Sequence, residues 1–191
     1  MGFERPAVMR FDVPFQADAP PLLSQDAGIT GLMERRATSH SIDVTLLDTA
    51  DDRLLRAGVL LAHRVLGGEG DWYLAAPGWA PYLPQECIIP IGATAELPQE
   101  FADLTRPLVR RAVLGPVAAL ECQRTEYLLR GPDGDLGAIR DERVTVRQGG
   151  VMTSRYREST LTSASQLSER QVRHVRAALD AVSATAVDEF P

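Results

Sequence analysis

The sequence predicts an α+β fold in which about eight antiparallel strands form a barrel with helices on its outside. Runs of alternating polar and apolar residues recur along the chain, and most are separated by short turns rich in glycine, proline and aspartate. Two longer segments have helical spacing, one in the middle of the chain and one near its end. A two-sheet α+β sandwich fits the same strands, and periodicity alone does not distinguish it from a barrel.

Strands are expected where polar and apolar residues alternate. In residues 3–15, Arg10 and Asp12 fall on one face, and Met9 and Phe11 fall on the other. The last three expected strands are joined by tight turns and form an antiparallel meander. After residues 3–15, the expected strands are residues 39–47, 59–65, 71–76, 86–91, 118–129, 136–147 and 151–161.

Two helices are expected. The first covers residues 98–113, where an apolar stripe is followed by a Gly-Pro pair that ends it. The second covers residues 168–183, with Ser168 as its N-cap. Residues 22–36 have mixed helical spacing, which Gly28 and a second glycine weaken. We expect a single domain over residues 1–187, in which residues 3–161 form the barrel. Residues 184–191 are expected to form a loose tail.

The composition excludes several classes of protein. A chain of 191 residues with 45% apolar residues is long enough for one domain with a real core. The net charge of −6 argues against nucleic acid or an anionic membrane as a partner. There is no apolar run long enough to span a membrane and no signal-peptide core, so we expect a cytoplasmic protein. The histidines show no metal-ligand spacing, and the two cysteines fit reduced thiols.

The chain contains no lysine, so all 20 of its basic residues are arginine. Mechanisms that need an amine, such as a Schiff base, a phosphate-binding lysine or a lysine general base, are therefore excluded. Arginine offers a planar fork of donors that matches carboxylate and phosphate oxygens. Any cationic site in this chain must be built from guanidinium groups.

The segment Thr45–Arg64 is the most informative stretch of the chain. It reads T-L-L-D-T-A-D-D-R-L-L-R-A-G-V-L-L-A-H-R, which combines a strand end, a turn with helical character, a glycine break and a second strand. It resembles the Y-Y-D-T-P-D-x-R-L-x-x-x-G-x-x-L-R-x-R motif of the CYTH family, also called triphosphate tunnel metalloenzymes. Four further pieces keep the family's order, M-R-F-D-V-P at 9–14, G-D-W-Y-L-A-A-P at 70–77, I-R-D-E-R-V at 139–144 and R-Y-R-E at 155–158.

The family resemblance implies an eight-stranded antiparallel barrel whose interior is a tunnel. In such a tunnel, carboxylates hold divalent metal ions and basic residues bind a triphosphate, because both neutralise the charge of the phosphoryl groups. Here the family's opening E-x-E-x-K falls on Pro6, Val8 and Arg10, so both of its carboxylates are replaced. Other charged positions of the family have become alanine, at Ala62, Ala75 and Ala138.

More cations than acids remain at the positions that the resemblance turns toward the tunnel. The candidate anion-binding residues are Arg10, Arg64, Arg124, Arg53 and Arg140. The weaker candidates for a metal site are Glu142, Glu158 and Asp141. We expect no cofactor. Mg²⁺ or Mn²⁺ is the alternative, since Mg²⁺ usually takes only one or two protein carboxylates beside phosphate oxygens.

We therefore expect a non-catalytic tunnel domain that binds a phosphate-rich anion, such as inorganic or organic polyphosphate, or serves as an interaction module. One alternative is a divergent metal-dependent phosphohydrolase that acts on triphosphate or polyphosphate. A second alternative is a structural scaffold for a protein partner. A homodimer is also compatible with the sequence. Glu4 enters the site only if Pro6 ends the first strand early.

Some of these residues also have a structural interpretation. In D-T-A-D-D-R-L, Asp48 and Thr49 are typical of turns and caps, and Arg53 can pair with a neighbouring aspartate at the surface. Arg155 and Arg157 share a strand face, and such a pair is expected at the surface.

Arg64 and Arg124 are the best candidates for interior cations. A buried arginine without an anionic partner is costly. If both point inward, we expect Glu126 and Glu142, or a bound anion, to pair with them.

Overall fold

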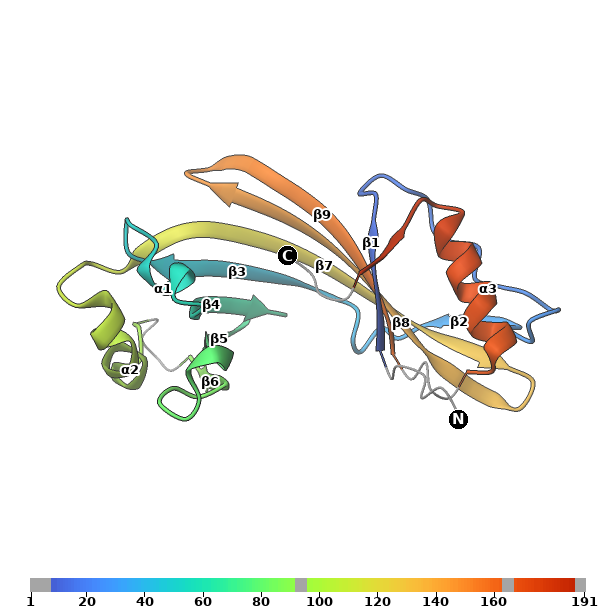
Figure 1. The fold of residues 1–191 in the computed structure, drawn as a ribbon, viewed down its shortest axis with the longest axis horizontal. Helices are drawn as coiled ribbons and strands as arrows, with labels where there is room; N and C mark the ends of the chain where they lie inside the picture. Colours follow the sequence, from blue (N-terminus) through green and yellow to red (C-terminus); the bar gives the residue numbers. More distant parts are fainter. Residues whose placement is uncertain (1–7, 92–95, 163–166, 188–191) are drawn as a thin grey trace. The chain divides into compact units, whose positions relative to one another are not determined.

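The computed structural model describes residues 8–91, 96–162 and 167–187, and its main feature is a ten-stranded antiparallel sheet (Figure 1). The strands are β1 (Val8–Val13), β2 (Gly31–Glu34), β3 (His40–Asp48), β4 (Leu60–Leu66), β5 (Glu69–Ala75), β6 (Glu86–Pro90), β7 (Gly115–Gly131), β8 (Gly134–Gln148), β9 (Val151–Thr162) and β10 (Thr185–Val187). The helices are α1 (Arg53–Arg56), the 3-10 helix η1 (Pro77–Trp79), α2 (Gln99–Val109) and α3 (Glu169–Asp180). None of the described helices combines the length and the apolar character that a membrane crossing requires.

Hydrogen bonds order the strands as β10-β1-β9-β8-β7-β3-β4-β5-β6, and β2 pairs with β7 outside this path. The predicted antiparallel meander is confirmed in β7, β8 and β9, which are longer than the alternating runs that predicted them. The order begins at β10 and ends at β6, so among the described residues hydrogen bonds do not close the sheet into a ring.

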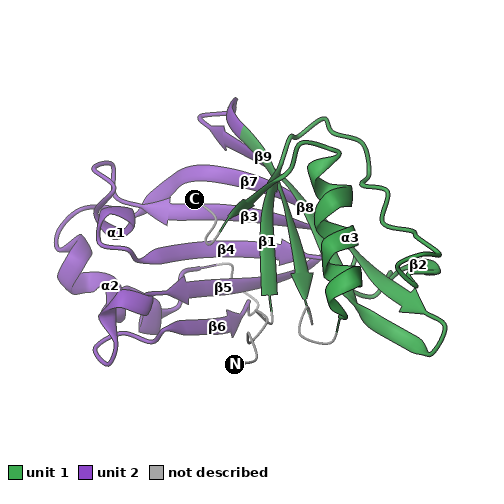
Figure 2. Ribbon diagram, turned by 45° about the vertical axis from the view of Figure 1, so that its right-hand side comes forward, with its two compact units in different colours: residues 1–40, 123–144, 155–191 green, residues 41–122, 145–154 purple. Residues whose placement is uncertain are grey.

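The chain divides into two compact units (Figure 2). Unit 1 contains residues 1–40, 123–144 and 155–191, and unit 2 contains residues 41–122 and 145–154. The long strands β7, β8 and β9 contribute residues to both units, and each unit has an apolar core of its own.

The core of unit 1 lies on one face of its strands. In β1, Met9, Phe11 and Val13 are buried, whereas the alternate residues are exposed, as the sequence predicts. α3 packs on this face through Val175 and Leu179 (Figure 2). α3 begins with the predicted cap, in which the Ser168 hydroxyl accepts from the Gln171 N–H and the Gln171 side chain accepts from the Ser168 N–H.

Two segments of unit 1 differ from the prediction. Residues 22–36 contain no helix, and hold instead a bridge between Ser24 and Ile29 followed by β2. Thr185–Val187 forms β10 beside β1, where the sequence predicts a loose tail. Both segments pair with strands that are distant in the sequence, so local periodicity carries no signal of them. The end of the predicted tail (188–191), Glu4 and Pro6 lie outside the described residues.

The core of unit 2 lies between α2 and the strands β4 and β5. Leu61, Trp72 and Leu74 of the strands and Phe101 of α2 are buried there. α2 ends at Val109, earlier than the predicted end at residue 113. The next residue, Arg110, has a positive φ of 59°, which turns the chain out of the helix.

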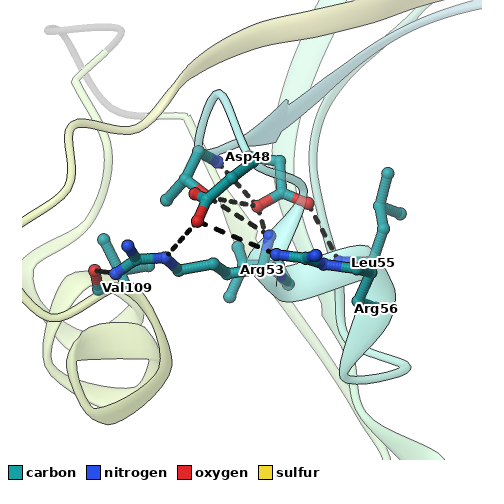
Figure 3. A network of polar contacts seen from close by, with 8 residues as sticks. Asp48, Arg53, Leu55, Arg56 and Val109 are labelled. Atoms are coloured by element: carbon teal, nitrogen blue, oxygen red, sulfur yellow. Dashed lines mark hydrogen bonds and ion pairs between the residues drawn. The ribbon is translucent and has the colours of Figure 1, made fainter.

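Asp48, at the end of β3, holds α1 in place (Figure 3). Its side chain is buried, with 1% of the residue exposed. Its carboxylate accepts hydrogen bonds from the backbone N–H groups of Thr49 at 2.6 Å, Leu54 at 2.9 Å and Leu55 at 2.9 Å. These donors include the first free N–H groups of a helix. The D-T-A-D-D-R-L motif therefore has a structural role in unit 2.

We predict that Asp48→Ala destabilises the protein strongly, because it leaves buried N–H donors without their acceptor. The expected loss in the free energy of unfolding is about 2–4 kcal/mol, measured by urea unfolding. Asp51→Ala is the matched control, and its expected loss is below about 1 kcal/mol because Asp51 is exposed. Equal losses in the two variants would contradict a central role of Asp48.

Candidate functional site

The candidate site lies on the charged face of the unit 1 strands. Alternate residues of a strand point to opposite faces, so the strands that place Phe11, Ile139 and Leu161 in the apolar core present their even-numbered residues on the other face. Ion pairs and electrostatic interactions link five of these residues. We call them the arginine–glutamate cluster, and they are Arg10, Arg124, Arg140, Glu142 and Glu158.

Glu142 is the centre of this cluster. Only 6% of the residue is exposed. Its Oε1 lies 2.7 Å from Nε and 2.6 Å from Nη2 of Arg124, and its Oε2 lies 3.1 Å from Nε of Arg140. One buried carboxylate is therefore paired with two guanidinium groups. A hydrogen bond fixes the geometry of the Arg124 pair, whereas the Arg140 contact is an ion pair without hydrogen-bond geometry. Glu142 is one of the partners that the sequence offers for an inward-pointing Arg124, and in the structure the two residues pair.

Glu158 is the second acid of the cluster, and burial raises its pKa to about 7. The charge of Glu142 contributes to this rise in pKa, while Arg140, Arg10 and Arg124 act in the opposite direction. The Oε2 atom of Glu158 is buried and makes no hydrogen bond within the described residues. Near neutral pH, Glu158 therefore exists in both the protonated and the ionised form.

The charge of this face depends on the state of Glu158. Asp12 stands opposite Glu158 in the β1–β9 register and is exposed. When Glu158 is ionised, Asp12, Glu142 and Glu158 balance the three arginines of the cluster. When Glu158 is protonated, the arginines are in excess by one charge. Acidic conditions therefore make this face more positive.

The three acids predicted as metal candidates do not converge. Glu142 and Glu158 share the charged face, but Asp141 precedes Glu142 in β8 and lies on the core face. There it accepts a hydrogen bond of 2.8 Å from Nε of Arg157. In the part of the chain that the structure describes, no three His, Cys, Asp or Glu side chains form a group that could hold a metal ion.

Arg64 lies in unit 2 and has a carboxylate partner there. Its Nε and Nη2 donate to the two carboxylate oxygens of Asp71 at 2.8 and 3.0 Å. Its guanidinium carbon also lies 4.2 Å from the centre of the Tyr73 ring. The sequence suggests Glu126 as an interior partner, but Glu126 pairs instead with Arg35 at 2.7 Å in unit 1. Asp71 offsets the charge of Arg64.

Arg53, also in unit 2, links two helices. Its Nε donates to Asp51 at 2.9 Å, and its Nη1 donates to the Val109 carbonyl at 2.9 Å (Figure 3). The hydrogen bond from Arg53 lowers the pKa of Asp51, with help from the Thr49 hydroxyl. These contacts join α1 to the end of α2, so the described contacts of Arg53 are structural.

Sequence reasoning does not identify Arg176 of α3. This exposed residue lines a cavity of about 230 Å³ together with Arg10, the first arginine of the cluster. The local sequence shows only that Arg176 is a basic residue on the polar side of the last helix. Such residues are common, so this pattern does not single out Arg176. The contact between α3 and the strands of unit 1 decides which basic residue lies near Arg10.

No family model matches the chain. Two uncharacterized proteins of Mycobacterium tuberculosis, MT2285 and Rv2226, are each 27% identical to it over 118 residues. The match covers 61% of this chain and 23% of each relative, so the chain spans less than a quarter of their length.

Several solved structures match over most of the chain at low identity. A Bacillus halodurans protein described as a candidate adenylate cyclase covers 82% of both chains, with a TM-score of 0.48 and 15% identity. HpAC1 of Hippeastrum, described as a candidate adenylyl cyclase with a dominant triphosphatase activity, covers 96% of this chain and 90% of its own, with a TM-score of 0.46 and 14% identity. The inorganic triphosphatase NE1496 covers 91% of this chain and 79% of its own, with a TM-score of 0.35 and 18% identity. A likeness at this level concerns the fold alone.

We predict that Glu158 makes stability depend on pH. Its folded pKa of about 7 lies above the ordinary value of 4.5, so the folded state binds this proton more tightly than the unfolded chain does. The resulting stability is fully present below about pH 4.5 and is lost as the pH rises through about 7. Glu158→Gln stays neutral, so it should gain stability over the wild type as the pH rises from about 5 to about 8 in urea unfolding.

Glu34→Gln is the control for this prediction, because Glu34 is exposed on β2. Its stability relative to the wild type should change little across the same pH range. A difference between Glu158→Gln and the wild type that does not vary with pH would contradict the raised pKa.

Proposed function

We propose that this CYTH-like domain is a non-catalytic module that binds a phosphate-rich anion, inorganic or organic, at the arginine–glutamate cluster of unit 1. The observation that carries the proposal is the position of Glu142, whose two carboxylate oxygens hold Arg124 and Arg140 next to each other. Arg10 acts on Glu158 within the same cluster. Three guanidinium groups on one sheet face offer a linear polyanion several points of attachment.

The exposure of these side chains supports such binding. The Arg124 and Arg140 side chains keep 28% and 36% of their surface exposed, although their partner Glu142 is buried. Glu142 orients the Arg124 guanidinium by a hydrogen bond and attracts the Arg140 guanidinium as an ion pair, and the exposed part of each can donate to phosphate oxygens. Because the guanidinium groups are held before the ligand arrives, less side-chain entropy is lost on binding.

The state of the acids supports binding without catalysis. Metal-assisted phosphoryl transfer requires ionised carboxylates that can reach the metal. Glu142 is occupied by two arginines, and Glu158 is partly protonated at neutral pH. Asp141 lies on the other face with Arg157. A divalent metal would have to displace an arginine from Glu142 and a proton from Glu158, and both exchanges cost free energy.

We predict that tripolyphosphate stabilises the protein without a metal ion, because the arginines provide the attraction. At about 100 times its dissociation constant, the ligand should add about 2.7 kcal/mol to the free energy of unfolding, which a thermal melt detects. A shift that requires Mg²⁺ or Mn²⁺ would overturn the proposal in favour of a metal-dependent phosphohydrolase, which a phosphate-release assay would then test. No shift in any condition would also overturn it, and would favour a scaffold for a protein partner.

We also predict that the site depends on named residues. Arg140→Gln should weaken tripolyphosphate binding about tenfold, because one charge-assisted contact is lost. Arg173→Gln, an exposed arginine of α3, is the matched control and should leave binding unchanged. In the wild type, acidification should strengthen binding more than it does in Glu158→Gln, where the proton on residue 158 no longer contributes. Equal affinity of Arg140→Gln and Arg173→Gln would contradict the assigned site.

A further inference from the structure

Unit 1 contains a second polar site, on the opposite face of its strands from the arginine–glutamate cluster. A cavity of about 240 Å³ opens there between β7, β8 and β9 and the segment that precedes β2. The lining has an apolar part, formed by Leu22, Leu32 and Ile139. Its polar part is formed by Gln123, Thr125, Tyr127, Asp141, Arg143, Arg157 and Ser159. The cavity is therefore amphipathic.

Arg157 is the buried cation of this cavity. Only 3% of the residue is exposed, whereas the sequence predicts a surface position. Its Nε donates to Asp141 at 2.8 Å, and its Nη1 donates to the Ala17 carbonyl at 2.5 Å. Within the described residues, these two bonds leave both N–H groups of Nη2 and one of Nη1 as donors for a ligand. Asp141 offsets part of the cost of burying this cation.

The charge of the cavity favours one negative group on a ligand. Arg157 and Arg143 carry two positive charges, and Asp141 carries one negative charge. The excess is therefore a single positive charge. A single carboxylate balances this charge. The Ser159 hydroxyl, buried at 3% exposure, can donate a further hydrogen bond in the cavity.

We propose that this cavity binds a small carboxylate with an apolar body. The carboxylate accepts hydrogen bonds from Arg157 and Arg143, since guanidinium and carboxylate groups match in geometry. The apolar body packs against Leu22, Leu32 and Ile139. The volume of about 240 Å³ lies below the usual range for drug-sized ligands, so the ligand is a single ring or a short branched chain.

This site is separate from the one proposed for phosphate-rich anions. β8 presents Asp141 to the cavity and Glu142 to the arginine–glutamate cluster, and consecutive residues of a strand point to opposite faces. The two ligands therefore bind opposite sides of the same strands, and either proposal can fail without the other.

The test is a titration of the full chain with sodium benzoate and sodium isovalerate, followed by ¹⁵N–¹H NMR spectra and calorimetry. At least one of them should bind saturably below about 10 mM, with the largest shifts at residues that line the cavity. Benzyl alcohol, which lacks the carboxylate, should bind at least about tenfold more weakly. Saturating tripolyphosphate should not displace the bound carboxylate. Binding of neither carboxylate by about 10 mM, or equal binding of benzyl alcohol, would overturn the proposal.

Two variants locate the binding without removing the buried Arg157. Arg143→Gln should weaken carboxylate binding about tenfold, because a charged donor is lost from the exposed rim. Thr125→Leu should weaken it by reducing the volume of the cavity. Arg173→Gln on α3 is the control and should bind as the wild type does. A melt of each variant checks that it is folded, and unchanged binding in folded Arg143→Gln and Thr125→Leu would overturn the assignment.

Discussion

The two-residue period of the β-strand is the constraint on which the charged and apolar parts of unit 1 depend. Each strand divides its residues between an apolar core covered by α3 and a face that carries arginine and glutamate. A shift of one residue in the register of β9 would bring Arg157 to the charged face and Glu158 to the core face. The ion pairs of both faces therefore depend on the same strand registers as the core does.

Asp141 and Glu142 show this constraint most clearly. They are neighbours in β8, yet they pair with arginines on opposite faces, Asp141 with Arg157 and Glu142 with Arg124 and Arg140. In each case a carboxylate contacts the guanidinium group of an arginine on its own face. Both proposed sites follow from this arrangement, because oriented guanidinium groups with donors left over are suited to anions. The two sites differ in the burial of their arginines. Arg157 is buried and lines a small cavity, whereas the Arg140 side chain is partly exposed.

Local sequence patterns predicted most strands and both long helices, and also the Ser168 cap. These features depend on residues near one another in the chain, so periodicity and capping residues are sufficient signals. The structural interpretation of the D-T-A-D-D-R-L motif was also available, because Asp48 precedes the N–H groups that it binds. β2 and β10 were not predicted, since both are short and owe their conformation to distant partners.

By itself, the sequence determined the antiparallel class of the fold, the absence of lysine chemistry and the set of arginines from which an anion site could be built. Tertiary structure alone decided which of these arginines are held together. Arg64 and Asp71 meet across neighbouring strands of unit 2, and Arg124 meets Glu142 across strands of unit 1. Tertiary structure also decided that Asp141 lies on the opposite face from Glu142 and Glu158, and that Arg157 is buried. The physical reason is that charge pairing and burial depend on strand register and on which elements cover each face, and neither property is local in the sequence.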